Sequence, residues 1–494
     1  MKKNIIITLS LFAFAISGCE KNYLELTVNP NTPSVATPQF ILSGAEKTTA
    51  DIVSMRVYSV YGMWIGYWAP SGASVPQASL INYNFQNTDY QVWGTLYSNL
   101  SNYNYLEVLA GDDPKLAKFK AIAKIMKAFN FQALVDNYNN VPYTTAFKGS
   151  ANVSPAYDTG GSIYDDLLKQ LDAAIALIKS SASATDPGAS DIMFGGDMTG
   201  WIKFANTIKL RLVIRQWNLT AKHAALSTAL NTTSADGYLD ETVQAKANPG
   251  YENNASDGGK QSPFWKTYGF DVNGNQAAGY QYDARANSYA VQSLTDKNDP
   301  RLSRFYLPIS GSVKGNAFGG PNPASNSVIS PAGAGLLKSP NQDAIILSSA
   351  ESLFLQSEAA VYGLIPGNAQ FLYERAITAS FIAVEVPNAS SQASTYYAQA
   401  GKNNVTWNDS PNKIQAIITQ KWIALNGYGN FEAYNEYRRT GYPIDVPRSV
   451  APGASGTTLP SRIFYPSSEY EQNGANVAKE GTIDRFTSKI FWAK

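Results

Sequence analysis

Apolar side chains recur every three or four residues in several segments, and this period constrains the fold more than any other sequence feature. It is clearest over residues 116–135, where one helical face would carry Leu116, Phe119, Ile122, Met126, Phe129 and Ala133. The same period predicts helices over about residues 38–67, 90–110, 201–217, 368–381 and 431–439, and others that begin near Ser162, Asp343 and Ser410-Pro411. We therefore expect a mostly α protein.

The predicted helices follow one another in short-linked pairs, and tandem pairs usually stack into a superhelix. No clean 34-residue repeat is visible. Residues 373–377 are the nearest fragment to a tetratricopeptide second helix, so any repeats are divergent. Residues from about 220 to 340, rich in Asn, Gly, Ser and Pro, are predicted to be irregular, and so are the last 50 or so residues.

The N-terminus has the features of a bacterial lipoprotein signal. Lys2 and Lys3 precede an apolar run over residues 5–16, which is too short to span a bilayer. The run ends in Ile16-Ser17-Gly18-Cys19, and Cys19 is the only cysteine in the chain. We therefore expect residues 1–18 to be a signal peptide, Cys19 to carry the lipid, and residues 19–37 to form an extended tether. The alternative is an ordinary secretory signal with an incidental cysteine.

Composition excludes several classes of function. His223 is the only histidine, which removes His-based metal sites and Ser-His-Asp or Cys-His catalysis. The net charge of +1 favours neither nucleic acid nor an anionic membrane surface as a partner. No segment after the signal is apolar enough to be a transmembrane helix. We expect no cofactor and no metal.

Aromatic residues are abundant, with 30 Tyr, 21 Phe and 9 Trp. Tyr and Trp combine an apolar ring with a polar group and therefore suit wet binding surfaces. Sugar rings present C–H patches that stack on such faces. The alternative for each single aromatic residue is ordinary packing in the core.

Blocks spread along the chain match one known family in order. They are Asn29-Pro30-Asn31, residues 120–129, 134–138 and 141–143, residues 201–206 with 209–212 and Arg215, Asp299-Pro300-Arg301-Leu302, Glu358-Ala359-Ala360, Gln420-Lys421-Trp422, residues 431–434 and 438–443, and residues 462–466 with Glu469 and Asn473. Together with the N-terminal signal, this ordered set resembles the SusD/RagB family of outer-membrane nutrient-binding proteins.

The resemblance implies a right-handed superhelical scaffold of divergent tetratricopeptide-type helix pairs, with an irregular loop-rich region packed on it. The expected domain covers residues 38–494: scaffold over about 38–230 and 341–442, a loop-rich ligand-binding region over about 231–340, and an irregular segment over 443–494. The resemblance also implies a lipid anchor in the outer membrane, facing the cell exterior. There the protein would capture an oligosaccharide or a peptide for a SusC-like TonB-dependent transporter, without catalysis. The alternatives are a helical-repeat adaptor that binds no nutrient and a glycoside hydrolase.

Ligand contacts are expected on loops held by the scaffold, because binding residues concentrate on such loops. Two regions hold aromatic residues that look exposed in the sequence: Trp64, Tyr67, Trp68, Tyr83 and Phe85, and then Trp265, Tyr268, Phe270, Tyr280, Tyr282 and Tyr289. Polar contacts could come from Asn273, Gln276, Gln281, Asp283 and Arg285. The alternative is hydrophobic packing of a long loop.

Two further patterns have a structural and a functional interpretation. Glu432 and Glu436 could be a glycosidase carboxylate pair, but we interpret them with Arg438 and Arg439 as structural ion pairs on one helix. Residues 271–275 begin like a calcium loop but lack the glycine and glutamate that such a loop needs later, since Gln276 and Tyr282 stand there. An Asn-Gly turn is the preferred interpretation.

Overall fold

The computed structural model describes residues 36–71, 77–256, 259–321 and 325–494. The predicted signal peptide, the lipidation of Cys19 and nearly all of the predicted tether lie outside these residues. The described chain is mostly helical and has two short two-stranded sheets. Among the described residues, no helix combines the length and the hydrophobicity required to cross a membrane.

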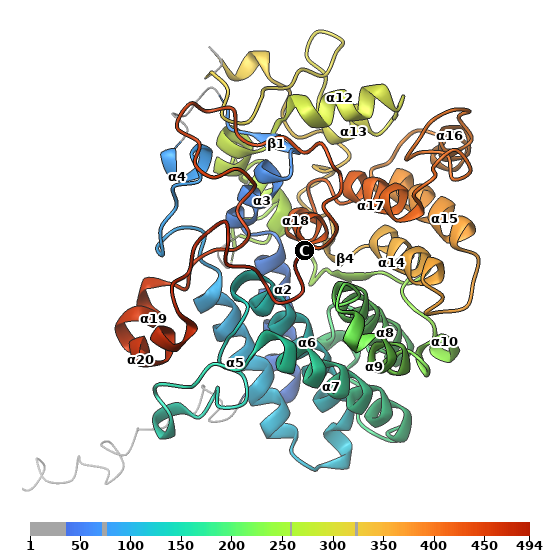
Figure 1. Cartoon of the computed structure of the whole chain (residues 1–494). Coiled ribbons are helices and arrows are strands. Elements are labelled where there is room, and N and C mark those ends of the chain that lie inside the picture. The colour runs from blue at the N-terminus through green and yellow to red at the C-terminus, as the bar shows by residue number, and fades with distance from the viewer. Residues whose placement is uncertain (1–35, 72–76, 257–258, 322–324) are drawn as a thin grey trace, which may run out of the picture.

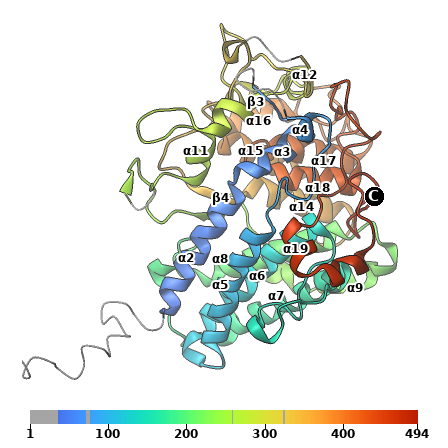
Figure 2. The ribbon, with the colours of Figure 1, turned by 90° about the vertical axis from the view of Figure 1, so that its left-hand side faces the viewer.

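The N-terminal half forms a row of antiparallel helices, shown in blue to green in Figures 1 and 2. Helix α2 packs against α5, and α5, α6, α7 and α8 pack in succession. Their bounds are α2 (Pro38–Val53), α5 (Trp93–Ala110), α6 (Ala117–Tyr138), α7 (Gly160–Ser180) and α8 (Met198–Arg215). This succession of neighbouring pairs is the tetratricopeptide-type arrangement that was predicted.

Two predictions about the first helices need correction. The helix expected over about residues 38–67 is divided: α2 ends at Val53, and α3 (Ser59–Trp64) follows a 3-10 turn. Helix α7 begins at Gly160 because the Thr159 side chain caps it by accepting from the Ser162 backbone N–H, so Ser162 is not the cap.

The C-terminal half adds a second set of packed helices. Helix α14 packs against α15 and α17, α15 against α16, and α18 against α3. Their bounds are α14 (Ser349–Val361), α15 (Ala369–Ala383), α16 (Ala389–Tyr397), α17 (Lys413–Ala424) and α18 (Asn430–Thr440). Helix α14 also contacts α8, so the two sets form one scaffold. Gly441, with a φ of +80°, ends α18 in the left-handed conformation that favours glycine.

Two predictions made from the local sequence pattern are wrong in this half. The segment from about Asp343, predicted to be helical, begins as strand β4 (Ala344–Leu347), which pairs with β2 (Ala245–Ala247). A strand partner about 100 residues away leaves no signal in the local period. Helix α17 is capped by Asn412, whose side chain accepts from the Gln415 backbone N–H, and not by Ser410.

The region over residues 220–340 is less irregular than predicted. It contains strand β3 (Arg285–Ala286), which pairs with β1 (Trp68–Ala69), and several short helices. These are α9 (His223–Ala229), α10 (Thr233–Asp236), α11 (Pro263–Tyr268), α12 (Ser288–Asp296) and α13 (Leu302–Phe305). In Figure 1, β1 and the yellow-green α12 and α13 lie together above the scaffold. The remaining short helices are α4 (Ala78–Ile81), α19 (Ser467–Gln472) and α20 (Gly474–Val477).

Candidate functional site

Six of the aromatic residues proposed as ligand contacts are buried in the core, so the expectation that they are exposed is wrong. They are Trp64, Tyr67, Trp68, Tyr83, Phe85 and Tyr268. Trp64 lies on α3, which packs against α18, and its ring packs against the tilted ring of Phe85 with centroids 5.5 Å apart. Tyr67 packs on Trp422 at 5.0 Å, and Trp68 on Tyr268 at 5.0 Å. These rings stabilise the contact between the loop-rich region and the helical scaffold.

The other aromatic candidates lie near or at the surface of the loop-rich region. Trp265, Phe270, Tyr282 and Tyr289 are partly exposed, and Tyr280 is nearly buried. The Phe270 ring bridges Trp265 and Tyr280, with centroid separations of 5.7 and 4.9 Å. Tyr289 is held separately because its hydroxyl donates to Asp445 at 2.8 Å. The structure therefore brings three of the predicted rings, Trp265, Phe270 and Tyr280, into one row.

Arg285 ends this row of rings. Its guanidinium lies 5.0 Å from the centroid of the Tyr280 ring, and its residue is only 3% exposed. Burial lowers the pKa of Arg285, an effect that the neighbouring Tyr280 opposes. Within the described part of the chain, the Arg285 side chain has no ion pair and no hydrogen bond, and its Nε is fully buried. A buried N–H group without an acceptor costs on the order of 1–3 kcal/mol, so this site is unusual for a purely structural residue. Tyr282 lies in the same helical turn as Tyr280, residues 279–283, and its own ring contacts the Arg56 guanidinium. We name Trp265, Phe270, Tyr280, Tyr282 and Arg285 the aromatic row.

The remaining polar candidates have different roles. Asp283 accepts two bonds from the Arg56 guanidinium, at 2.5 and 3.0 Å, and this ion pair uses both of its oxygens. Asp271 accepts from the backbone N–H groups of Asn273 and Asn275. That geometry is a closed turn, as the preferred interpretation expected, with Asn273 and Gln276 exposed beside it. Among the described residues, no group of His, Cys, Asp and Glu could hold a metal ion.

Sequence analysis missed one residue next to the aromatic row. Asn326 donates to the Gln281 carbonyl at 3.1 Å, while its own Oδ1 is buried and has no partner. It comes from a segment 45 residues further along the chain. No pattern around Asn326 could have connected it with Gln281, because only the tertiary fold brings the two segments together.

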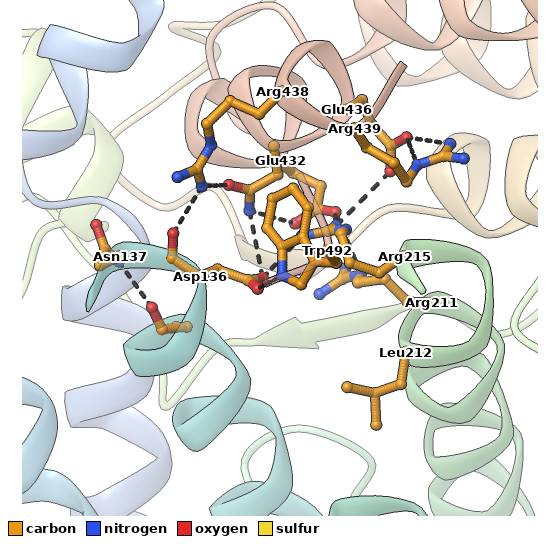
Figure 3. Close-up of polar contacts among 12 residues, drawn as sticks. Asp136, Asn137, Arg211, Leu212, Arg215, Glu432, Glu436, Arg438, Arg439 and Trp492 are labelled. Carbon is orange, nitrogen blue, oxygen red and sulfur yellow. Dashed lines mark hydrogen bonds and ion pairs between the residues drawn. The ribbon is translucent and has the colours of Figure 1, made fainter. Parts of the chain in front are cut away.

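Glu432 and Glu436 belong to a buried ion network between the two halves of the scaffold (Figure 3). Arg215 pairs with Asp136 at 2.7 Å and with Glu432, while Lys421 and Arg439 pair with Glu436. Arg439 also forms two hydrogen bonds with Glu358, and Arg211 pairs with Glu351 at 2.7 Å.

The protonation of this network fits a structural role. Burial alone would raise the pKa of Glu436, but Arg439, Lys421 and Arg215 outweigh burial and hold the pKa well below its usual range. The acid of a glycosidase needs a raised pKa so that it keeps its proton at neutral pH. The pair of Glu436 and Arg439 is the ion pair predicted within α18. The prediction is wrong for the other two residues: Glu432 pairs with Arg215 of α8, and Arg438 forms no ion pair among the described residues but donates to the backbone carbonyls of Asp136 and Ser461.

Comparison with known proteins gives one consistent result. Residues 30–466 match the model of the SusD-like family, described as "Starch-binding associating with outer membrane". A SusD homologue from Bacteroides fragilis is 22% identical and superimposes with a TM-score of 0.75 over 93% of this chain and 99% of that one. A chitin-binding SusD homologue from Flavobacterium johnsoniae is 23% identical, with a TM-score of 0.71 over 91% and 98% of the two chains. A SusD homologue from Bacteroides uniformis is 23% identical, with a TM-score of 0.72 over 92% and 99%. The search of curated proteins found no match.

Proposed function

Because the chain belongs to the SusD-like family, we propose that it is a surface-exposed nutrient-binding protein of the outer membrane that captures an oligosaccharide. The match over residues 30–466 is the observation that carries this proposal. Lipidation of Cys19 would anchor the protein, and a SusC-like TonB-dependent transporter would receive the ligand. The name of the family points to starch, and a relative with the same fold binds chitin.

The aromatic row is the proposed contact surface for the ligand. Trp265, Phe270 and Tyr282 are partly exposed, so their faces can stack on sugar rings. The Arg285 guanidinium has five N–H donors and contacts the Tyr280 ring, but it has no hydrogen-bond acceptor among the described residues. It would donate to sugar hydroxyl oxygens, or to the carbonyl and carboxylate oxygens if the ligand is a peptide.

Isothermal titration with malto-oligosaccharides, chito-oligosaccharides and a peptide mixture tests this proposal. Replacing Trp265 or Tyr282 by Ala should weaken binding of the preferred ligand by about tenfold or more, since one stacked ring contributes on the order of 1 kcal/mol or more. Tyr105→Ala is the matched control, because Tyr105 is 47% exposed on α5, outside the aromatic row.

Other results of these experiments would favour one of the alternative functions or refute the proposed binding surface. Equal affinity in all variants would refute the assignment of the aromatic row. If no member of the panel binds but a transporter co-purifies with the protein, the result would favour the adaptor alternative. Release of reducing ends from an oligosaccharide would favour the hydrolase. Metabolic labelling with a fatty acid, compared between the wild type and Cys19→Ser, tests the anchor.

A further inference from the structure

A cavity of about 600 Å³ lies between the helical scaffold and the loop-rich region, and no residue of the aromatic row lines it. Its walls come from α2, α5, α6, α8, α14, α15, strands β2 and β4, and the turn between α17 and α18. Apolar side chains such as Ile52, Leu96 and Phe129 line part of it. Its volume falls within the roughly 300–1,000 Å³ that is typical of small-molecule sites.

Polar groups without partners lie along α6 in the wall of this cavity. Asn130 is 1% exposed; its Nδ2 donates to the Met126 carbonyl, but its Oδ1 has no partner. Gln132 is 2% exposed, and neither its Oε1 acceptor nor its Nε2 donor has a partner. Burying such an oxygen without a hydrogen bond costs on the order of 1–3 kcal/mol. Buried polar atoms of this kind usually mark the place of a bound molecule or an ordered water.

Arg211 adds a further unused donor to these amide groups. Arg211 lines the same cavity, and its Nε makes no hydrogen bond; the Glu432 carboxylate oxygen with which it forms a long ion pair is 3.8 Å away. Figure 3 shows Arg211 beside Arg215, below Glu432. An ammonium ion could satisfy the two amide oxygens but neither the Arg211 Nε nor the Gln132 Nε2 donor, and a carboxylate could satisfy these donors but neither amide oxygen. A hydroxyl group both donates and accepts, so it can serve all three side chains.

The charges around the cavity are already paired. In its deep part, Glu351 pairs with Arg211 and Asp136 with Arg215, each at 2.7 Å. Nearer the surface, Lys246 pairs with Asp343 at 2.6 Å, and Lys338 with Glu385 at 3.3 Å. An ionic ligand would find no free counter-charge among these groups and would lose its hydration. Because these charged side chains already pair with one another, the cavity favours a neutral ligand.

We propose that this cavity binds a small, neutral, hydroxyl-rich molecule about the size of one or two sugar rings. Its hydroxyls would bond to Asn130, Gln132 and Arg211, and its C–H faces would pack on the apolar wall. This site uses none of the residues of the aromatic row, so the inference does not rest on the proposed function. A protein with both sites would hold a long ligand at its surface and a small one in this cavity.

The test combines crystals soaked with a sugar and titration of the wild-type protein. Glucose and N-acetylglucosamine are the neutral probes, glucuronate the anionic probe and glucosamine the cationic probe. At least one neutral probe should occupy the cavity and bind more tightly than both charged probes. Electron density that shows only ordered water with both neutral sugars would overturn the proposal, and so would equal or tighter binding of a charged probe.

Three variants locate the binding. Ala133→Phe fills the cavity, because Ala133 is one of its lining residues. It should abolish the binding of the neutral probe, whereas Ala173→Phe, at an exposed position of α7, should not change it. Gln132→Met keeps the length of the side chain and removes the amide, with its unpaired acceptor and donor, which should weaken binding by about tenfold or more. If Ala133→Phe does not fold, Gln132→Met still decides the question: unchanged affinity in that variant would refute the site.

One further variant separates the two proposals. Arg285→Met should weaken oligosaccharide binding at the aromatic row and leave the cavity's affinity for the neutral probe unchanged. If Arg285→Met also removed the binding of the small probe, the probe would be bound at the surface, and the cavity would not be a ligand site. If oligosaccharides fail to bind while glucose or N-acetylglucosamine occupies the cavity, the proposed function fails and the present inference stands.

Discussion

Arg439 offers the sharpest test of what holds the two halves of the scaffold together. It is 1% exposed, and its guanidinium donates to both carboxylate oxygens of Glu358 at 2.7 and 2.8 Å and to Glu436. Within the described residues, Glu358 has no other ion-pair partner, while Glu436 keeps Lys421. Arg439→Met would therefore leave the Glu358 carboxylate buried and unpaired. We expect a loss of about 3–5 kcal/mol in the free energy of unfolding.

Arg375→Met is the matched control for this substitution. Arg375 also holds a carboxylate with two bonds, to Glu241 at 2.9 and 2.5 Å, but the two side chains are 29% and 40% exposed. Solvent screens such a pair, so its removal should cost less than about 1 kcal/mol. The two variants remove the same group and differ mainly in burial.

Urea unfolding, followed by circular dichroism at pH 7, measures both losses. Adding Glu358→Met to Arg439→Met removes the stranded carboxylate and should restore most of the stability, because a buried ion pair is often replaced by apolar side chains at little cost. The reasoning would be refuted if Arg439→Met cost no more than Arg375→Met. It would also be refuted if the double variant were no more stable than Arg439→Met alone.

Three further predictions concern single residues. Burial, and to a smaller extent Asp191, raises the pKa of the Glu46 carboxyl group. The stability that protonated Glu46 contributes is therefore present below the unfolded pKa of about 4.3 and is lost as the pH rises through the folded pKa. Glu46→Gln should raise the melting temperature at pH 8 but not at pH 4, and an equal rise at the two pH values would contradict this. Arg285→Met should keep or increase the free energy of unfolding in urea while it weakens oligosaccharide binding, because it removes a buried N–H group that has no acceptor; a clear loss of stability would indicate a structural residue. Trp492→Phe removes the 2.9 Å hydrogen bond from Nε1 to Asp136 and should cost about 1.5–3 kcal/mol in urea unfolding; a cost below about 0.5 kcal/mol would show that the bond adds no net stability.

The helices were largely predictable because their signal is local. The apolar face over residues 116–135 corresponds to α6, and residues 368–381 and 431–439 correspond to α15 and α18 within a few positions. Helix ends were less predictable, because several polar residues near an end can cap it. Thr159 and Asn412 cap α7 and α17, although Ser162 and Ser410 looked equally suitable in the sequence.

The candidate site was predictable only in part. Tyr83 and Phe85 stand in a stretch rich in Gly, Pro, Ser and Asn, which predicted an exposed loop, yet both side chains are fully buried. The Tyr83 hydroxyl accepts from the Ser449 backbone N–H, 366 residues further along the chain. The row of Trp265, Phe270 and Tyr280 was predictable as a group, because those residues are close in sequence.

The sequence by itself determined the helical period, the order of the family blocks and the chemical types of side chain available for a site. Only the tertiary structure decided which of those side chains are buried and which charges are paired. Asp136, for example, bonds to Arg215 and to Trp492, which lie 79 and 356 positions further along the chain. The physical reason is that helix formation depends on neighbours within one or two turns, whereas burial and ion pairing depend on segments that meet only when the chain has folded.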